Sequence, residues 1–171
     1  DLCCGSGVIA VVLARELGEH VVAVDISFKA LAIARENCKR HGVSKRVTPL
    51  HGDLFHPVRD REPFQLIVSN PPYVKHSDII TTLEPEVADH EPIIALDGGR
   101  TGLECIEKIV EGLPSVLARG GDFFMEIGDG QGGTVQSMFL ENGGDNRYEF
   151  VHVYTDYSGR DRVIHLRRTE Q

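Results

Sequence analysis

The strongest constraint on the fold is an alternation of short apolar runs with segments of helical periodicity. The apolar runs, which are typical of buried strands, lie at residues 21–25, 46–50, 64–68 and 122–127. Apolar residues recur at helical spacing in residues 9–17, 30–38, 102–117 and 135–139. This order predicts an α/β fold with three layers, α/β/α, in which helices cover both faces of a mostly parallel sheet. Alternating residues at 148–154 and 162–166 predict an antiparallel C-terminal hairpin that closes the sheet.

Single residues predict where some of the helices begin and end. Ser27 can cap the helix that follows the strand at 21–25, and Gly42 suits the end of that helix. Pro114 is expected to end or kink the helix at 102–117. Residues 74–102 have no clear period, so no element is predicted there. An aperiodic stretch of this length in a compact domain is usually functional, and we expect residues 84–103 to form a wall or lid beside Tyr73.

The beginning of the chain bears on its domain organisation. The 171 residues fit one domain, 1–171. However, the chain starts at Asp1, directly before a glycine-rich turn that a strand should precede. We therefore expect the first, central strand to be truncated and the chain to be a fragment of a longer protein.

Charge and cysteine usage limit the partners. The net charge of −8 disfavours nucleic acid, whose phosphate backbone is bound through Lys and Arg. The four cysteines show no C-x-x-C spacing, which argues against zinc and disulfides and favours a reducing, cytoplasmic setting. No metal site is predicted. No apolar run is long enough to cross a membrane, so no membrane partner is expected.

The first candidate binding motif is the glycine-rich turn. Gly5 and Gly7 permit a tight turn from strand to helix and close approach of a ligand to the backbone. Asp25 ends the next strand, where a carboxylate can accept both ribose hydroxyls of an adenosine cofactor. This pattern also fits NAD-binding folds. Asp1 favours S-adenosylmethionine instead, because an acidic group suits a cation and repels a pyrophosphate; the plain alternative is a helix-capping aspartate.

The second candidate follows the next predicted strand. Asp53 could accept the adenine amino group, and Leu54 and Phe55 could pack on the adenine ring. The alternative is a turn aspartate followed by two core residues, and the sequence leaves both interpretations open.

The third motif, Asn70-Pro71-Pro72-Tyr73, carries the most chemical information. An amide nitrogen is a poor nucleophile because its lone pair is delocalised into the carbonyl. The Asn70 side-chain oxygen and the Pro71 carbonyl can accept both N–H groups of a primary amide and favour the pyramidal form of its nitrogen. Pro72 restricts Pro71, and Tyr73 offers a flat wall for a planar group. No general base is needed, so catalysis would consist of positioning and electrostatic complementarity.

Together these motifs resemble class I S-adenosylmethionine-dependent methyltransferases that act on planar nitrogens. Further segments are similar to the release-factor glutamine N5-methyltransferase family (HemK/PrmC). These segments are residues 84–92, 95–99, 102–103, 126–128 with Gln131, and 156–163.

The resemblance covers nearly the whole chain and implies a fold and an activity. The implied fold is Rossmann-like with seven strands, and the implied substrate is the glutamine of the Gly-Gly-Gln loop of class 1 peptide chain release factors. By matching position, Gly5, Gly7, Asp25, Leu54 and Asn70 would contact the cofactor, and residues 70–73 would hold the glutamine amide. The N-terminal helical domain of the family is absent from this sequence.

Other functions remain open at this point. The same chemistry would serve methylation of a glutamine in a ribosomal protein, or of adenine N6 in a nucleic acid. A non-catalytic binding module and an NAD-dependent oxidoreductase are further alternatives. Measurable methyl transfer would exclude the non-catalytic module. Competition between NAD and S-adenosylmethionine in a binding titration would decide whether the chain is an oxidoreductase.

Overall fold

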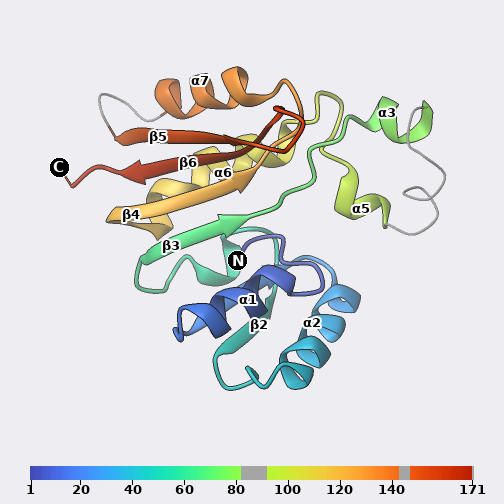
Figure 1. Cartoon of the computed structure of the whole chain (residues 1–171), viewed down its shortest axis with the longest axis vertical. Helices are drawn as coiled ribbons and strands as arrows, with labels where there is room; N and C mark the ends of the chain where they lie inside the picture. The colour runs from blue at the N-terminus through green and yellow to red at the C-terminus, as the bar shows by residue number, and fades with distance from the viewer. Residues whose placement is uncertain (82–91, 143–146, 171) are drawn as a thin grey trace. The chain divides into compact units, whose positions relative to one another are not determined.

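The structure, a computed structural model, describes residues 1–81, 92–142 and 147–170 (Figure 1). The chain forms two compact units, Asp1–Glu62 and Pro63–Gln171, and each is described by itself. The prediction of one catalytic domain over residues 1–171 stays a prediction.

The first unit is a two-stranded parallel sheet on which two helices pack. Its elements are α1 (Val8–Glu16), β1 (Val21–Asp25), α2 (Phe28–Arg40), β2 (Val47–His51) and a short 3₁₀ helix (His56–Val58). The predicted strands and helices of this region are confirmed to within one or two residues at most boundaries. Ser27 caps α2 as expected, since its hydroxyl accepts a hydrogen bond from the Ala30 N–H at 3.2 Å.

Small residues let the helices of the first unit approach closely. Ala10 and Ala14 of α1 and Leu31 of α2 are fully buried in one cluster, and Ala34 of α2 is fully buried as well. A Cβ atom at Gly7 would lie 2.9 Å from the Ala34 Cβ, so only glycine fits at the start of α1. The turn sequence therefore serves the packing of this unit as well as the shape of the turn.

The segment before the glycine-rich turn makes only one bridge. Leu2 pairs in parallel with Val24 of β1, and the Cys4 N–H donates to the Val24 carbonyl at 3.0 Å. Between residue 1 and the turn, the structure contains no strand beyond this bridge. The described residues form six strands in two hydrogen-bonded sets, where the family resemblance implied one sheet of seven.

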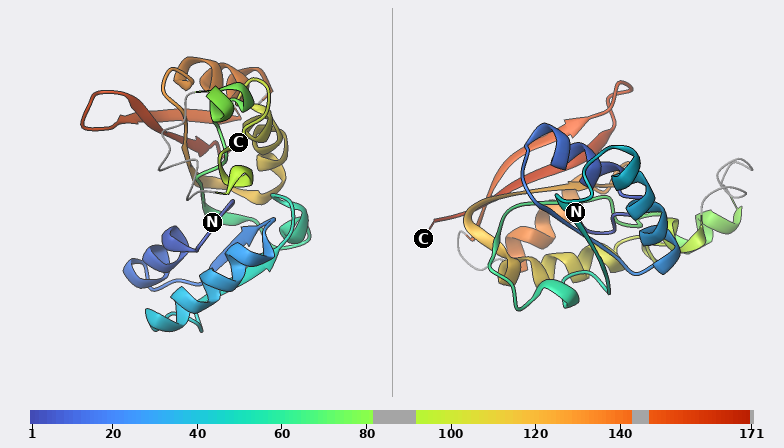
Figure 2. Two further views of the ribbon diagram at one scale, coloured as in Figure 1. Left: turned by 90° about the vertical axis from the view of Figure 1, so that its right-hand side faces the viewer. Right: turned by 90° about the horizontal axis from the view of Figure 1, so that it is seen from below.

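The second unit is a four-stranded sheet with the order β3-β4-β6-β5. β3 and β4 are parallel, whereas β6 is antiparallel to both β4 and β5. The predicted C-terminal hairpin is thus confirmed: both its strands belong to this sheet, and the left view of Figure 2 shows its turn extending outward. The strands are β3 (Phe64–Ser69), β4 (Leu117–Glu126), β5 (Tyr148–Thr155) and β6 (Asp161–Arg168).

Two long helices cover this sheet. α6 (Glu104–Val116) packs on β4, and α7 (Gly132–Asn142) packs on β5, β6 and α6 (Figure 1). Phe123, Met125 and Ile127 are fully buried, whereas Asp122 and Glu126 alternate with them and are partly exposed. This period of two is what a strand with one covered face requires.

Three local predictions differ from the structure. The short helices α3 (His76–Thr81) and α5 (Ile93–Leu96) lie where no element was predicted, because four to six residues are too few to show a helical period. β4 begins at Leu117 rather than at Asp122, since its first residues pair with β3 through a register irregularity. α6 continues past Pro114 to Val116, because the buried side chains of Leu113 and Val116 hold its last turn.

Among the described helices, none combines the length and the apolar character that crossing a membrane would need.

Candidate functional site

The glycine-rich turn and the end of β1 are joined by hydrogen bonds. The Gly5 N–H donates to Asp25 Oδ2 at 2.8 Å, and the Gly7 N–H donates to the Cys4 carbonyl at 2.8 Å. Gly5 and Gly7 have φ angles of +54° and +78°, in the left-handed region that favours glycine. A Cβ atom at Gly5 would meet no other atom within 4 Å, so the turn is open on this side. The structure thus brings three predicted cofactor residues together around an accessible backbone.

The carboxylate of Asp25 also holds the start of α2. Its Oδ1 accepts a hydrogen bond from the Ser27 N–H at 2.8 Å, so both oxygens already accept one backbone N–H each. A carboxylate offers about four acceptor positions, which leaves room for further donors. The predicted role of Asp25 toward ribose hydroxyls therefore stays a prediction that the geometry permits.

Asp1 has the helix-capping role that the sequence left open, and its predicted role toward a cation stays a prediction. Its Oδ2 accepts a hydrogen bond from the Ala10 N–H at 2.9 Å, in the first turn of α1, so Asp1 does cap that helix. Its Oδ1 is buried and has no hydrogen-bond partner among the described residues. A buried carboxylate oxygen without a partner is costly, and a cationic ligand or hydrogen-bond donor would relieve that cost.

The segment after β2 lies against the end of β1. The Gly52 N–H donates to the Asp25 carbonyl at 3.1 Å, and the Asp53 carbonyl accepts from the His56 N–H at 2.9 Å. Asp53 is exposed, whereas Leu54 is half-buried with a φ of +42°. A left-handed leucine costs about 1–3 kcal/mol, and such strain is often found where a ligand is held. Asp53 and Leu54 are thus placed beside Asp25, and their contacts with adenine remain a prediction.

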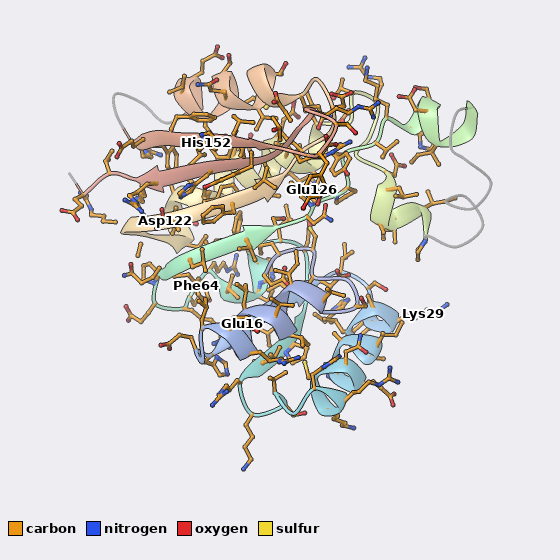
Figure 3. The ribbon with its side chains drawn as sticks, in the orientation of Figure 1. Glu16, Lys29, Phe64, Asp122, Glu126 and His152 are labelled. Atoms are coloured by element: carbon orange, nitrogen blue, oxygen red, sulfur yellow. The ribbon has the colours of Figure 1, made fainter. Side chains whose placement is uncertain are left out.

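The Asn-Pro-Pro-Tyr motif directly follows β3 in the second unit. Asn70 is exposed, Pro71 is buried, and Pro72 and Tyr73 are half-buried. The Tyr73 hydroxyl donates to Glu126 Oε1 at 2.8 Å, and Glu126 is the last residue of β4. Figure 3 labels Glu126 at this end of β4, with Asp122 toward the other end. Parallel neighbouring strands end at the same edge, which explains why these two residues meet.

The backbone of Tyr73 is held by Gln131. The Gln131 Nε2 donates to the Tyr73 carbonyl at 3.1 Å and to the Gly102 carbonyl at 3.2 Å. Its Oε1 accepts from the Gly128 N–H at 2.8 Å. In the sequence, Glu126 and Gln131 belong only to the segments that carry the family resemblance, and no local pattern indicates their contacts with Tyr73.

Part of the predicted wall lies beside Tyr73. The Val74 N–H donates to the Leu96 carbonyl at 3.0 Å, and the Gly98 N–H donates to the Val74 carbonyl at 2.8 Å. A Cβ atom at Gly98 would lie 2.8 Å from the Tyr73 Cα, so glycine is required for this close approach. Leu96 and Gly98 of the stretch 84–103 thus lie against the chain at Tyr73 and Val74, whereas 84–91 lie outside the described residues.

Hydrogen bonds to carboxylates order this wall. Asp97 Oδ2 contacts His76 Nδ1 at 2.8 Å and Asp97 Oδ1 accepts from the Gly99 N–H, and these bonds lower the pKa of Asp97. Burial alone would raise the pKa of Glu104, but hydrogen bonds from Thr101 and Leu103 outweigh burial and lower the pKa to about 2. Both carboxylates are therefore ionised at neutral pH and hold the loop between α5 and α6.

The turn of the C-terminal hairpin is also built around a carboxylate. Asp156 Oδ1 accepts from the N–H groups of Ser158 and Arg160, and Asp156 Oδ2 accepts from Arg162 Nε at 3.0 Å. The Arg162 carbonyl accepts from the Ile127 N–H at 2.9 Å, next to Glu126. This segment, one of those that carry the resemblance, therefore packs against the end of β4.

Comparisons with known proteins bear on the family. The model of the family described as "Methyltransferase small domain" matches residues 1–93. Release factor glutamine methyltransferases of Geobacter sulfurreducens and Gloeobacter violaceus are 44% and 41% identical over 167 and 165 residues. These matches cover 96% of this chain and 55% and 56% of the relatives, so the chain spans about half the length of the curated relatives it matches. The resemblance found in the sequence is thus confirmed.

Solved structures bear on the fold. A ribosomal protein L11 methylase from Lactobacillus delbrueckii subsp. bulgaricus matches with a TM-score of 0.70 at 21% identity, covering 99% of this chain and 68% of the methylase. An RNA methyltransferase from Salinibacter ruber, solved with S-adenosyl-L-homocysteine, matches with a TM-score of 0.59 at 20% identity, covering 100% and 80%. At these identities the likeness shows the fold alone, and it confirms the predicted Rossmann-like methyltransferase fold. The chain belongs to the methyltransferase small domain family.

Proposed function

We propose that this chain transfers a methyl group from S-adenosylmethionine to the side-chain amide nitrogen, N5, of the glutamine in the Gly-Gly-Gln loop of class 1 peptide chain release factors. The observation that carries the proposal is the Asn-Pro-Pro-Tyr motif at the carboxyl end of β3, with Tyr73 held at its hydroxyl and at its carbonyl. The names of the most similar relatives support the choice of substrate.

The chemistry requires two fixed acceptors. The Asn70 Oδ1 and the Pro71 carbonyl would each accept one N–H of the substrate amide, which leaves the nitrogen lone pair free for attack. Pro71 is buried and precedes a second proline, so its carbonyl has little freedom to move. When bound, S-adenosylmethionine supplies an electrophilic methyl group on a sulfonium. The S–CH₃ bond breaks as the N–CH₃ bond forms, and one N–H proton then leaves to water.

The first unit offers the features that S-adenosylmethionine needs. Asp25 presents acceptor positions beside the open turn at Gly5 and Gly7, and Asp53 and Leu54 lie next to it. The Asp1 Oδ1, which has no partner among the residues that the structure describes, fits a positively charged group of the cofactor, the sulfonium or the ammonium. We assign Asp1, Gly5, Gly7, Asp25, Asp53, Leu54 and Asn70 to cofactor binding, and residues 70–73 to the substrate amide.

The protein substrate and the cellular location follow from this assignment. The release factor is the protein substrate, and no direct binding of nucleic acid is expected for a chain with a net charge of −8. The cytoplasm, where translation ends, is the proposed location.

The test is methyl transfer from radiolabelled S-adenosylmethionine to a purified class 1 release factor. The matched control is the same factor with alanine in place of the glutamine of Gly-Gly-Gln. Label that enters the first protein and not the second supports the proposal. Label that enters a glutamine of a ribosomal protein, or an adenine-containing oligonucleotide, in preference to the release factor contradicts it and supports one of the alternatives.

A further inference from the structure

The Gln131 carboxamide joins three backbone segments of the second unit. Its nitrogen donates to the carbonyls of Tyr73 and Gly102, and its oxygen accepts from the Gly128 N–H. One planar group thus connects the exit of β3, the loop before α6 and the exit of β4. Only Asn and Gln side chains carry two amide donors and an acceptor in this arrangement, and Asn is one methylene shorter.

The contacts of Gln131 reach the motif through a stiff stretch of chain. The Tyr73 carbonyl is one residue beyond Pro72, whose ring fixes its φ angle, and Pro71 is in turn restricted by Pro72. Few backbone torsions therefore separate the carbonyl that Gln131 holds from the Pro71 carbonyl. A shift at Tyr73 would move the Pro71 carbonyl as well.

The packing around these bonds leaves little freedom. A Cβ atom at Gly102 would lie 2.6 Å from the Tyr73 oxygen, and one at Gly128 would lie 3.2 Å from Tyr73 Cδ2. The Tyr73 hydroxyl is bound separately by Glu126. Glu126 and Gln131 flank the same loop between β4 and α7, so this loop holds Tyr73 at its ring and at its backbone.

We propose that Gln131 is a positioning residue for methyl transfer, which holds the Tyr73 carbonyl and thereby the Pro71 carbonyl that receives the substrate amide. This inference rests on the proposed function, because it assumes that Pro71 is an acceptor in the reaction. A misplacement of about 1 Å in a positioned group can cost about 100-fold in rate. Gln131 touches neither substrate nor cofactor in this account.

A substitution at Gln131 can separate a positioning role from a purely structural one. Gln131 immediately precedes α7, and its carbonyl accepts from the Val135 N–H at 2.9 Å. The variant Gln131→Glu keeps the oxygen that accepts from Gly128 and adds negative charge at the helix N-terminus, which favours the helix. It removes the two donors and turns an oxygen toward the carbonyls of Tyr73 and Gly102. A fall in kcat with an unchanged cofactor Kd, measured at a temperature where the variant is fully folded, is therefore specific to positioning.

The experiment compares Gln131→Glu with Gln136→Glu, the same chemical change on α7, in the full 171-residue chain. Steady-state methylation of the release factor gives kcat and KM, and a titration gives the Kd for S-adenosylmethionine. The Val74 and Gly98 N–H groups are hydrogen-bonded within the wall beside Tyr73. Their hydrogen–deuterium exchange reports how well ordered this region is, and it can be measured whether or not the protein is active.

For Gln131→Glu we expect kcat to fall by about 10- to 100-fold, with a cofactor Kd close to that of the parent. The thermal midpoint should be lower, because two hydrogen bonds are lost. The Val74 and Gly98 amides should exchange faster, and Gln136→Glu should behave as the parent. An unchanged kcat, or equal losses in kcat and cofactor affinity, would overturn the positioning role. If the parent itself does not methylate the release factor, the proposed function fails, and exchange then tests whether Gln131 holds the Tyr73 carbonyl. Faster exchange supports that hold, and unchanged exchange overturns it.

Discussion

The Tyr73 hydroxyl donates a hydrogen bond of 2.8 Å to Glu126 Oε1, across a sequence separation of 53 residues. The two residues meet because β3 and β4 are parallel neighbours, with Ser69 opposite Met125 in the register. The bond links the Asn-Pro-Pro-Tyr motif to the strand whose other face forms the core of the second unit. The orientation of the Tyr73 ring is therefore determined by the sheet rather than by its own loop.

Tyr73→Phe removes this bond and leaves the carboxylate of Glu126 without its partner. We expect the free energy of unfolding to fall by about 1–2 kcal/mol, with a larger loss in methyl transfer than in cofactor affinity. Tyr157→Phe is the matched control, since Tyr157 is fully exposed. Urea denaturation and steady-state kinetics make the comparison. Equal behaviour of the two variants would show that the hydroxyl of Tyr73 has no role.

Asp25→Ala removes the acceptor of the Gly5 and Ser27 N–H groups. We expect the cofactor to bind more weakly by about 1.5–3 kcal/mol, the scale of hydrogen bonds to a charged group. Part of the free energy of unfolding should be lost as well, because the glycine turn and α2 both depend on this carboxylate. Asp60→Ala, at an exposed position of the same unit, should change neither quantity. Calorimetric titration that gives an unchanged Kd for Asp25→Ala would remove Asp25 from the cofactor site.

Gly102→Ala tests the close approach between the wall and the motif. Gly102 has a φ of +80°, and a Cβ atom there would lie 2.6 Å from the Tyr73 oxygen. Strain in the left-handed region and the clash together should cost about 2–5 kcal/mol of unfolding free energy. Gly130→Ala is the control, since its φ is +77° but a Cβ would meet nothing within 4 Å. It should lose only the conformational cost, about 1–2 kcal/mol. Similar losses in thermal midpoint for both variants would mean that the loop at Gly102 moves away from the Tyr73 oxygen at little cost.

Glu104 makes stability depend on pH. Burial by itself raises the pKa of this carboxyl, but its hydrogen bonds outweigh burial and lower the pKa from 4.5 to about 2. A lowered pKa in the folded state stabilises the protein fully above pH 4.5, and this contribution is lost as the pH falls toward about 2.

Glu104→Gln should therefore differ most from the parent in unfolding free energy at neutral pH. The difference should shrink between pH 4.5 and about 2. Glu107→Gln, an exposed position in the first turn of the same helix, is the control and should show little pH dependence. Urea denaturation at a series of pH values gives the curves. A difference between Glu104→Gln and the parent that does not change with pH would contradict this assignment.

The sequence predicted most of what depends on local pattern. The alternation of strands and helices, the cap at Ser27, and the approach of Asp25 to the turn at Gly5 all follow from residues close in sequence or from the rule that parallel strands end at one edge. The bonds of Glu126 and Gln131 to Tyr73 could not be predicted, because they span 53 and 58 residues and depend on side-chain geometry. Asp1 shows a third case: the helix cap is confirmed at its Oδ2, whereas binding of a cation at its Oδ1 stays a prediction.

The proposed methyl transfer takes place on a glutamine amide at the motif that begins with Asn70. The most direct test is mass spectrometry of a class 1 release factor after incubation with S-adenosylmethionine and either the parent chain or Asn70→Ala. Because Asn70 is exposed, the variant should keep the stability of the parent and most of its cofactor affinity.

With the parent chain, the Gly-Gly-Gln peptide should gain one methyl group, and fragmentation should place that group on the glutamine side chain. With Asn70→Ala, the peptide should stay unmodified. A peptide that stays unmodified with a parent chain that binds the cofactor, or one that is methylated equally by both proteins, would contradict the proposed transfer to glutamine at Asn70.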